Sequence, residues 1–165
     1  MSGVPAVTLG LGSNLGNRLA NLQAAVDGLA REGVHALACS RVWQTAPVGG
    51  PDGQPPYLNA VVRASTGLTP EDVLAAGHRI ERERGRMRDV RWGPRTLDVD
   101  LLLYDDLVLE GADLTLPHPR IAERGFVVLP LLDIDPDPVL PTGVRLLDRA
   151  VEGAASPYAP PLRLP

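Results

Sequence analysis

The stretch that decides the fold is RWGPRTLDVDLLLY, residues 91–104. From residue 96 onward two sets of side chains alternate, with Leu97, Val99, Leu101 and Leu103 on one side and Thr96, Asp98, Asp100, Leu102 and Tyr104 on the other. A period of two predicts a β-strand. Residues two apart on a strand share a face, with Cα atoms about 6–7 Å apart. The two aspartate side chains are therefore predicted to point from the same face.

Two carboxylates this close repel each other unless a cation lies between them. Hard oxygen ligands on a strand suit Mg²⁺, which commonly takes one or two carboxylates and completes its shell with phosphate oxygens and water. The preceding residues carry the opposite charge, with arginines at 86, 88, 91 and 95. Guanidinium groups beside a carboxylate pair indicate a polyphosphate site. The alternative is an ordinary edge strand whose acids, like the basic loop, are simply solvated.

Composition restricts the possible functions. At 165 residues the chain is long enough to bury a core, and a net charge of −4 gives no reason to expect nucleic acid as a partner. All 16 basic residues are arginine, so a P-loop, which needs its lysine, is excluded. Cys39 is the only cysteine, and no apolar run is long enough to span a bilayer. These features predict a cytoplasmic protein that does not bind membranes, and a monomer is expected.

Hydrophobic periodicity predicts alternating strands and helices along the chain. Strands are predicted over residues 6–11, 34–44 and 57–65. Apolar residues at spacings of three and four predict a helix through Leu19, Leu22, Val26 and Leu29. A second helix is predicted to begin at Thr69-Pro70, a capping residue followed by an N1 proline, and to stop at Gly85. The glycine-rich residues 10–17 are interpreted as a tight strand-to-helix turn rather than a dinucleotide fingerprint.

Beyond the central stretch the predicted elements become shorter. A short strand is predicted over 107–110, a helical turn over 120–124, a short or kinked helix over 126–132 because of Pro130, and a last short helix over 145–152. Residues 1–153 are predicted to form a single domain. Residues 154–165 are rich in proline and are predicted to be an unstructured tail.

Three polar residues have two possible interpretations each. Asn59 is either a turn residue or an amide that reads the edge of a polar heterocycle, since an amide offers donor and acceptor together. Glu81 is either solvated helix surface or a group directed toward the arginine loop. His118 lies between two prolines, which is poorly explained as core filling, although it could cap a loop.

Taken together, these segments resemble the 6-hydroxymethyl-7,8-dihydropterin pyrophosphokinases, enzymes of folate biosynthesis. The resemblance runs from residue 10 to about residue 141. Its most specific part is the stretch Arg-Trp-Gly-Pro-Arg-Thr-Leu-Asp-Val-Asp at 91–100. The other matching segments are Gly12-Ser13-Asn14-Leu15-Gly16, Thr45-Ala46-Pro47-Val48-Gly49, Gln54-Pro55-Pro56-Tyr57-Leu58-Asn59, Glu81 with Gly85-Arg86, Pro117-His118-Pro119 and Arg124-Gly125-Phe126.

The resemblance implies a fold and a reaction. The fold would be α+β, with a ferredoxin-like core whose antiparallel sheet is flanked by helices. The reaction would move the β,γ-pyrophosphoryl group of ATP, the co-substrate, to the hydroxymethyl oxygen of the pterin, with release of AMP. The partners are then ATP and the pterin.

The resemblance also implies roles for individual residues. Asp98 and Asp100 would hold two Mg²⁺ ions on the triphosphate. The catalytic loop would supply Arg86, Arg88, Arg91, Trp92 and Arg95. ATP would also contact Glu81, Arg95, His118 and Arg124. The pterin would be bound by Thr45, Val48, Tyr57, Asn59, Trp92 and Phe126.

Two positions depart from the family pattern, and neither is a metal or transfer group. Pro119 replaces a tyrosine that often follows the histidine, and Ala46 stands where some relatives have proline. Two rival functions remain open at this point. One is another Mg²⁺-dependent nucleotidyl or phosphoryl transferase with a different acceptor. The other is a ferredoxin-like regulatory module that binds a ligand without chemistry.

Overall fold

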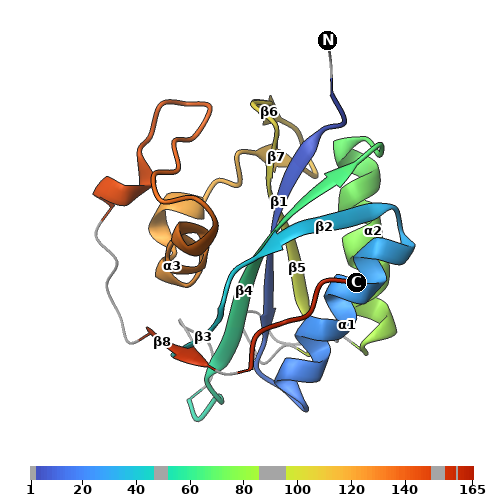
Figure 1. The fold of residues 1–165 in the computed structure, drawn as a ribbon, viewed down its shortest axis with the longest axis vertical. Coiled ribbons are helices and arrows are strands. Elements are labelled where there is room, and N and C mark those ends of the chain that lie inside the picture. The colour runs from blue at the N-terminus through green and yellow to red at the C-terminus, as the bar shows by residue number, and fades with distance from the viewer. Residues whose placement is uncertain (1–2, 47–51, 86–95, 150–154, 159) are drawn as a thin grey trace.

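The chain is built around one antiparallel sheet, seen in the computed structural model of Figure 1. The structure describes residues 3–46, 52–85, 96–149, 155–158 and 160–165. Six strands form the sheet in the order β5-β1-β4-β3-β8, with β2 also paired to β4. The elements are β1 (Ala6–Ser13), α1 (Arg18–Arg31), β2 (Val34–Cys39), β3 (Val42–Thr45), β4 (Tyr57–Thr66), α2 (Pro70–Glu83), β5 (Asp98–Tyr104), β6 (Leu109–Glu110), β7 (Thr115–Leu116), η1 (Ile121–Glu123), α3 (Gly125–Ile134), η2 (Leu146–Asp148) and β8 (Ala155–Tyr158).

The order of the main elements confirms the predicted fold class. With β2 and β3 taken as one interrupted strand, the chain runs β-α-β-β-α-β, which is the ferredoxin-like arrangement. Strand β1 pairs with β4 on one side and β5 on the other, and both pairings are antiparallel. Because β1 is the central strand, its residues from Val7 to Ser13 are all buried.

Helices cover both faces of the sheet. Figure 1 shows α1 and α2 together on one face and α3 on the other. The larger apolar cluster lies under α1 and α2 and includes Leu22, Ile80, Val99 and Leu101. A second cluster lies under α3, where Val61 and Leu102 contact the helix residues Val128 and Leu131. The acidic pair and Asn59, discussed below, lie on the α3 face, whereas Glu81 belongs to α2.

Local sequence signals set the ends of the first two helices. The side chain of Asn17 accepts a hydrogen bond from the backbone of Ala20 and caps α1. Thr69 caps α2 in the same way through the backbone N–H of Asp72, as its position before Pro70 predicts. Gly85, with φ of +75°, follows the end of α2, a backbone conformation that favours glycine. The predicted bounds of α2 are therefore confirmed.

The predicted alternation along β5 is correct only up to Leu102. The register between β1 and β5 shifts between Thr8 and Leu9, which leaves Leu102 as the extra residue of a β-bulge. Leu103 therefore packs on the α3 side, while Tyr104 turns toward α2, where its hydroxyl donates to the carbonyl of Leu68. Side chains beyond the bulge thus exchange faces relative to the prediction.

The single strand predicted over 34–44 is in fact two strands. Both β2 and β3 pair with β4, but the ladder is interrupted between them. At the interruption the Ser40 hydroxyl accepts from the backbone of Val61, and the N–H of Arg41 donates to the carboxylate of Asp133 on α3. The prediction fails because a side chain distant in sequence binds a backbone group that a continuous strand would use.

The prediction of an unstructured tail is wrong for residues 155–158. They form β8, which pairs antiparallel with the edge of β3. Further along, Leu162 is buried in the larger core, and the backbone of Arg163 exchanges two hydrogen bonds with the side-chain amide of Gln23 on α1. The C-terminal segment therefore covers a sheet edge. Within the predicted last helix 145–152, the described residues form only the three-residue η2.

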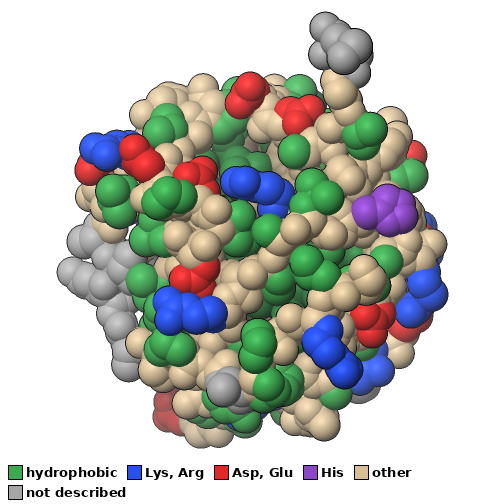
Figure 2. All heavy atoms as spheres, viewed as in Figure 1, with side chains coloured by type: hydrophobic (Ala, Val, Ile, Leu, Met, Phe, Trp, Pro, Cys, Tyr) green, Lys and Arg blue, Asp and Glu red, His purple; other side chains and the backbone are tan. Residues whose placement is uncertain are grey.

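Figure 2 shows charged side chains of both signs interspersed over one face of the molecule. Exposed ion pairs include Arg145 with Asp137 and Arg79 with Glu32. Such solvent-exposed pairs contribute little to stability, so the buried clusters account for most of it. Among the described residues, no helix combines the length and apolar character needed to cross a membrane.

Candidate active site

The acidic pair lies where the strand pattern predicts. Asp98 and Asp100 are half-buried, while Val99 and Leu101 between and beyond them are buried toward α2. Both carboxylates consequently lie on the α3 face of the sheet. Asp98 is opposite Gly12 of β1, and Asp100 is opposite the next glycine of that face, at position 10. Strand β1 therefore contributes no side chain of its own beside either carboxylate.

Asn59 lies in the same row of the sheet as Asp98. Gly12 separates them, because it is opposite Asp98 on one side and opposite Asn59 on the other. Two strand spacings make the distance between these residues about 10 Å. A Cβ at position 12 would lie 3.0 Å from Oδ1 of Asn59. The glycine thus lets the Asn59 side chain lie close to β1, and we call the sheet surface from Asp98 across Gly12 to Asn59 the floor.

The amide of Asn59 is buried and held in one orientation. Its nitrogen donates a 2.6 Å hydrogen bond to the hydroxyl of Thr45, which is also buried. Tyr57 is half-buried opposite Thr45, and its ring lies 3.6 Å from where a Cβ of Gly12 would be. The interpretation of Asn59 as a simple turn residue is therefore wrong. The structure places a threonine, a tyrosine and an oriented amide together at one end of the floor.

Glu81 is not solvated helix surface. The residue is only 2% exposed, and its carboxylate accepts a 3.0 Å hydrogen bond from the backbone N–H of Val99. Val99 stands between Asp98 and Asp100. The buried carboxylate on α2 therefore binds the backbone of β5 at the position that separates the two acids.

His118 is a neutral group fixed by two hydrogen bonds. Its backbone N–H donates to the carbonyl of Leu102 on β5, and its Nδ1 accepts from the backbone N–H of Arg120. Burial, reinforced by the charges of Arg124 and Arg120, lowers the pKa of His118 to about 4. With Nδ1 acting as acceptor, the proton of the neutral ring lies on Nε2. The loop-cap interpretation is thus correct for Nδ1, and Nε2 is the nitrogen that can donate elsewhere.

A polar network holds the glycine-rich turn. The Asn21 amide on α1 donates to the hydroxyl of Ser13 and to the carbonyl of Leu15. Its oxygen accepts two hydrogen bonds from Arg84, at 3.2 and 2.8 Å. The turn is the tight strand-to-helix connection predicted, and Gly16 within it has φ of +68°. Arg84, directly after α2, is joined by this network to the turn after β1.

Two predicted site residues lie at the start of α3, and six others lie outside the described part of the chain. Arg124 precedes the first residue of α3, and Phe126 belongs to the first turn of that helix, although its side chain is not among the described groups. The predicted site residues that lie outside the described part of the chain are Val48, Arg86, Arg88, Arg91, Trp92 and Arg95.

The sequence analysis missed two features of the site. A glycine inside a strand often marks a place where a ligand or another part of the chain comes close to the backbone. Gly10 and Gly12 could therefore have been predicted from the sequence to belong to the site. The network of Asp133 with Arg41 and Trp43 on β3 carried no such signal, because 90 or more positions separate the partners in the sequence.

Comparison with known proteins connects this geometry to a family. Residues 8–136 match the family model described as 7,8-dihydro-6-hydroxymethylpterin-pyrophosphokinase (HPPK). A 2-amino-4-hydroxy-6-hydroxymethyldihydropteridine pyrophosphokinase from Synechocystis sp. is 42% identical over 161 residues, covering 94% of this chain and 82% of that protein. The protein of the same name from Pseudomonas aeruginosa is 40% identical over 163 residues, covering 98% of both chains.

A solved structure shares the fold. It is described as an HPPK-DHPS crystal structure in complex with substrates, and it aligns with a TM-score of 0.69 at 12% sequence identity. The match covers 90% of this chain but 43% of that chain, so it supports the architecture alone. The family model spans well over half of the sequence, and the two bacterial relatives are matched over 82% and 98% of their own lengths. The chain therefore belongs to the 7,8-dihydro-6-hydroxymethylpterin-pyrophosphokinase family.

Proposed function

We propose that this protein is the Mg²⁺-dependent pyrophosphokinase that moves pyrophosphate from ATP to the hydroxymethyl group of 6-hydroxymethyl-7,8-dihydropterin and releases AMP. Pyrophosphokinase activity in folate biosynthesis is the activity of its family. One observation carries the assignment to this site: Asp98 and Asn59 lie in one row of the sheet with only Gly12 between them. A polyphosphate group bound through Asp98 and a flat heterocycle bound by Asn59 would therefore lie side by side.

The acidic pair fits a magnesium site that is completed by the nucleotide. Within the described ranges, no three His, Cys, Asp or Glu side chains gather closely enough to hold a metal ion. Two carboxylates alone leave most of an octahedral shell to be filled by phosphate oxygens and water, which is the usual arrangement for Mg²⁺ with nucleotides. Asp98 and Asp100 would hold the metal, two ions being expected. The metal would neutralise charge on the transferred group.

The ATP phosphates are assigned to the end of the floor where Asp98 and Asp100 lie. His118 supports this because its neutral ring donates from Nε2, so it can bind a phosphate oxygen without adding a fixed charge. Arg124, next to it, brings a guanidinium that can bind phosphate in bidentate fashion. Phosphoryl-type transfer asks mainly for positioning and charge stabilisation. The arginines proposed to supply the rest of that charge are Arg86, Arg88, Arg91 and Arg95.

We assign the pterin to the other end of the floor. The oriented amide of Asn59 can pair with the donor and acceptor edge of the ring, and Thr45 keeps that amide from rotating. Tyr57 borders the same surface. Aromatic side chains suit the faces of a flat ring. Three further residues complete the proposed pocket: Val48, Trp92 and Phe126.

Glu81 is assigned to the ATP site as a positioning residue. Its carboxylate binds the N–H of Val99, so it fixes the backbone that carries both metal-binding aspartates. A buried carboxylate that accepts a backbone hydrogen bond resists displacement, because breaking a buried hydrogen bond costs free energy. Its contribution to ATP binding is therefore made through β5.

A product assay tests the proposal. The protein is incubated with ATP, Mg²⁺ and 6-hydroxymethyl-7,8-dihydropterin, and adenine nucleotides are separated by chromatography. Formation of AMP and pyrophosphorylated pterin in equal amounts supports the proposal. Formation of ADP or free pyrophosphate instead would point to a different transferase. Nucleotide binding with no turnover of any pterin would point to a regulatory module.

Two further properties are proposed with the function. We propose that the protein acts as a monomer, since the floor and both of its ends come from strands of one sheet. We also propose a cytoplasmic location, where ATP is available. Gel filtration and cell fractionation would test these points.

A further inference from the structure

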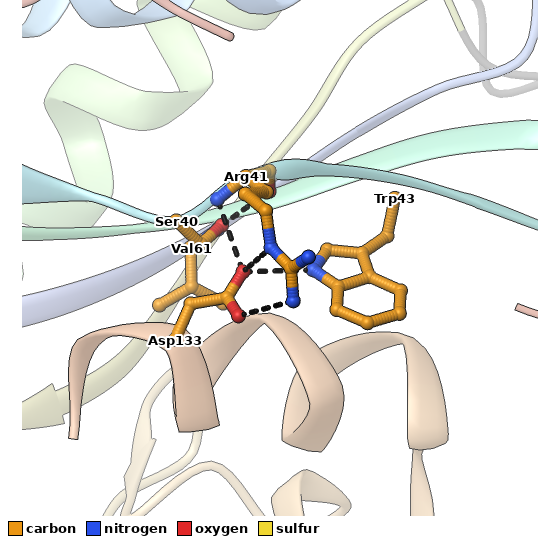
Figure 3. A network of polar contacts seen from close by, with 5 residues as sticks. All are labelled: Ser40, Arg41, Trp43, Val61 and Asp133. Carbon is orange, nitrogen blue, oxygen red and sulfur yellow. Dashed lines mark hydrogen bonds and ion pairs between the residues drawn. The ribbon is translucent and has the colours of Figure 1, made fainter. Parts of the chain in front are cut away.

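The carboxylate of Asp133 connects the α3 helix to the segment that begins β3. Asp133, near the end of α3, accepts hydrogen bonds from the backbone N–H of Arg41 at 3.1 Å and from its guanidinium at 3.3 and 3.0 Å. It also accepts a 3.0 Å bond from the indole nitrogen of Trp43. Figure 3 shows the carboxylate facing these donors across the gap between helix and strand.

An acid at this position needs an explanation. The C-terminal end of a helix carries partial negative charge, so a carboxylate in the last turn is disfavoured there. The side chain of Asp133 is also only 17% exposed. Burial by itself would raise the pKa of its carboxyl, yet the donors from Arg41 and Trp43 outweigh that effect and the pKa is lowered. The four hydrogen bonds thus offset both the repulsion from the helix end and the cost of burying the carboxylate.

The strand side of this network continues to the pterin end of the floor. Trp43 is directly opposite Asn59 in the register of β3 and β4. Two residues further along β3, Thr45 holds the Asn59 amide. The guanidinium of Arg41 lies 4.9 Å from the centre of the Trp43 ring, so the donors of Asp133 also contact one another.

The helix of this network, α3, also carries Phe126, one of the three further residues of the proposed pocket. Phe126 lies in the first turn of α3, two turns before Asp133. No side chain caps the start of this helix, and Pro130 lies inside it. The contacts of α3 with Val61 and Leu102 are apolar, and apolar packing is not directional. At the end of the helix, Asp135 lies 3.9 Å from Arg63 on β4 in a longer, more exposed ion pair. Asp133 therefore supplies directional bonds that define where α3 sits along β3.

We propose that Asp133 is a positioning residue for the pterin pocket, which it acts on by fixing α3 relative to β3. The inference rests on the proposed function, because it assumes that the pocket lies between these two elements. A ring bound between them requires a constant separation, and displacements of about 1 Å at a binding constellation can cost as much as 100-fold in rate. At the ATP end of the floor, β5 and His118 lie outside this network. Arg124 directly precedes α3, so it is the one residue assigned to ATP that a shift of the helix is expected to affect.

Calorimetric titrations test the proposal. The pterin is titrated into the full-length protein in the presence of a non-hydrolysable ATP analogue and Mg²⁺, and the analogue is titrated separately. Asp133→Ala is expected to weaken pterin binding about tenfold and to change the affinity for the analogue less than twofold. The control is Asp137→Ala, which removes the exposed ion pair with Arg145 just beyond α3 and should leave both affinities unchanged.

A second variant covers the case in which Asp133→Ala does not fold. Trp43→Phe keeps an aromatic ring beside Arg41 but removes the indole N–H donor. It is expected to weaken pterin binding by about two- to threefold with the analogue affinity retained. A purely structural role for Asp133 would lower thermal stability without separating the two affinities.

The outcomes are distinct. Loss of pterin affinity alone in Asp133→Ala or Trp43→Phe supports the proposal. Unchanged pterin affinity in a folded Trp43→Phe variant, or equal losses for both ligands, overturns it while the function stands. Failure of the wild-type protein to bind the pterin overturns the proposed function and this inference with it.

Discussion

The side-chain amide of Asn59 donates a 2.6 Å hydrogen bond to the hydroxyl of Thr45, and both side chains are buried. This bond joins two strands, β4 and β3, and it determines which way the amide faces. A buried amide left without a partner costs roughly 1–3 kcal/mol. The contact therefore couples the fold of the sheet to the recognition of the pterin that we propose for Asn59.

The first prediction concerns this pair. Asn59→Leu removes both donor and acceptor at similar size, so pterin affinity should fall by about one to two decades, with ATP affinity nearly unchanged. Thr45→Val keeps the shape but removes the acceptor, and should cost about three- to tenfold in pterin affinity. Calorimetry with each ligand measures both effects. Loss of ATP affinity with pterin affinity retained would assign Asn59 to the nucleotide instead.

The second prediction concerns Gly12. A Cβ at this position would lie 3.0 Å from Oδ1 of Asn59, so Gly12→Ala must displace the amide. Crowding of this kind costs about 1–3 kcal/mol, and pterin affinity should fall about tenfold or more. Gly10→Ala is the matched control on the same strand and face, because there the nearest atom is a flexible Leu102 methyl at 3.4 Å. Equal effects of the two substitutions would contradict the role of Gly12.

The third prediction concerns the acidic pair. Asp98→Ala and Asp100→Ala should each abolish Mg²⁺-supported AMP release while the protein stays folded, because deleting one acid also relieves repulsion between the two. Circular dichroism and urea unfolding measure the fold, and chromatography measures AMP. Asp106→Ala, in the exposed turn after β5, is the control and should keep normal turnover. Near-normal AMP release from both site variants would refute the metal assignment.

The fourth prediction concerns pH and His118. The pKa of this histidine is lowered from 6.5 to about 4, so the unfolded chain binds more protons than the native protein between these values. Stability contributed by the neutral ring is therefore complete above pH 6.5 and is lost as the pH falls toward 4. Since the side chain is partly exposed, we expect this loss to be about 1–2 kcal/mol, less than the full shift would give.

Urea unfolding at pH 7 and pH 4.5 measures this loss. His118→Gln, which has no titrating ring, should lose less stability than the wild type over the same range. His35→Gln, on the exposed part of β2, is the control and should behave like the wild type. A wild-type protein equally stable at both pH values would contradict the effect.

The fifth prediction concerns the C-terminal segment. A chain that ends at residue 154 loses β8 and the buried side chain of Leu162, and it exposes the edge of β3. We expect a loss of about 2–3 kcal/mol in the free energy of unfolding, together with aggregation through the free edge. Thermal unfolding and light scattering measure the two effects. The point variant Leu162→Ala should reproduce part of the destabilisation without the aggregation.

The sequence by itself determined most of the helices and strands before residue 105 and the placement of the acidic pair. A period of two places Asp98 and Asp100 on one face whatever the strand pairs with, because side-chain direction along a strand is a local property. The cap at Thr69 and the glycine after α2 set the helix ends for the same reason. Motif order identified the family because the matching segments follow one another in sequence.

The tertiary structure alone decided which residues meet. The row that joins Asp98, Gly12 and Asn59 depends on the register of three strands, and register follows from packing of the whole sheet. The bulge at Leu102, the pairing of β8 with β3 and the bond from Glu81 to Val99 depend on partners 18 to more than 100 positions away. Such contacts are selected by burial and hydrogen-bond satisfaction across the folded chain, which no local pattern of residues specifies.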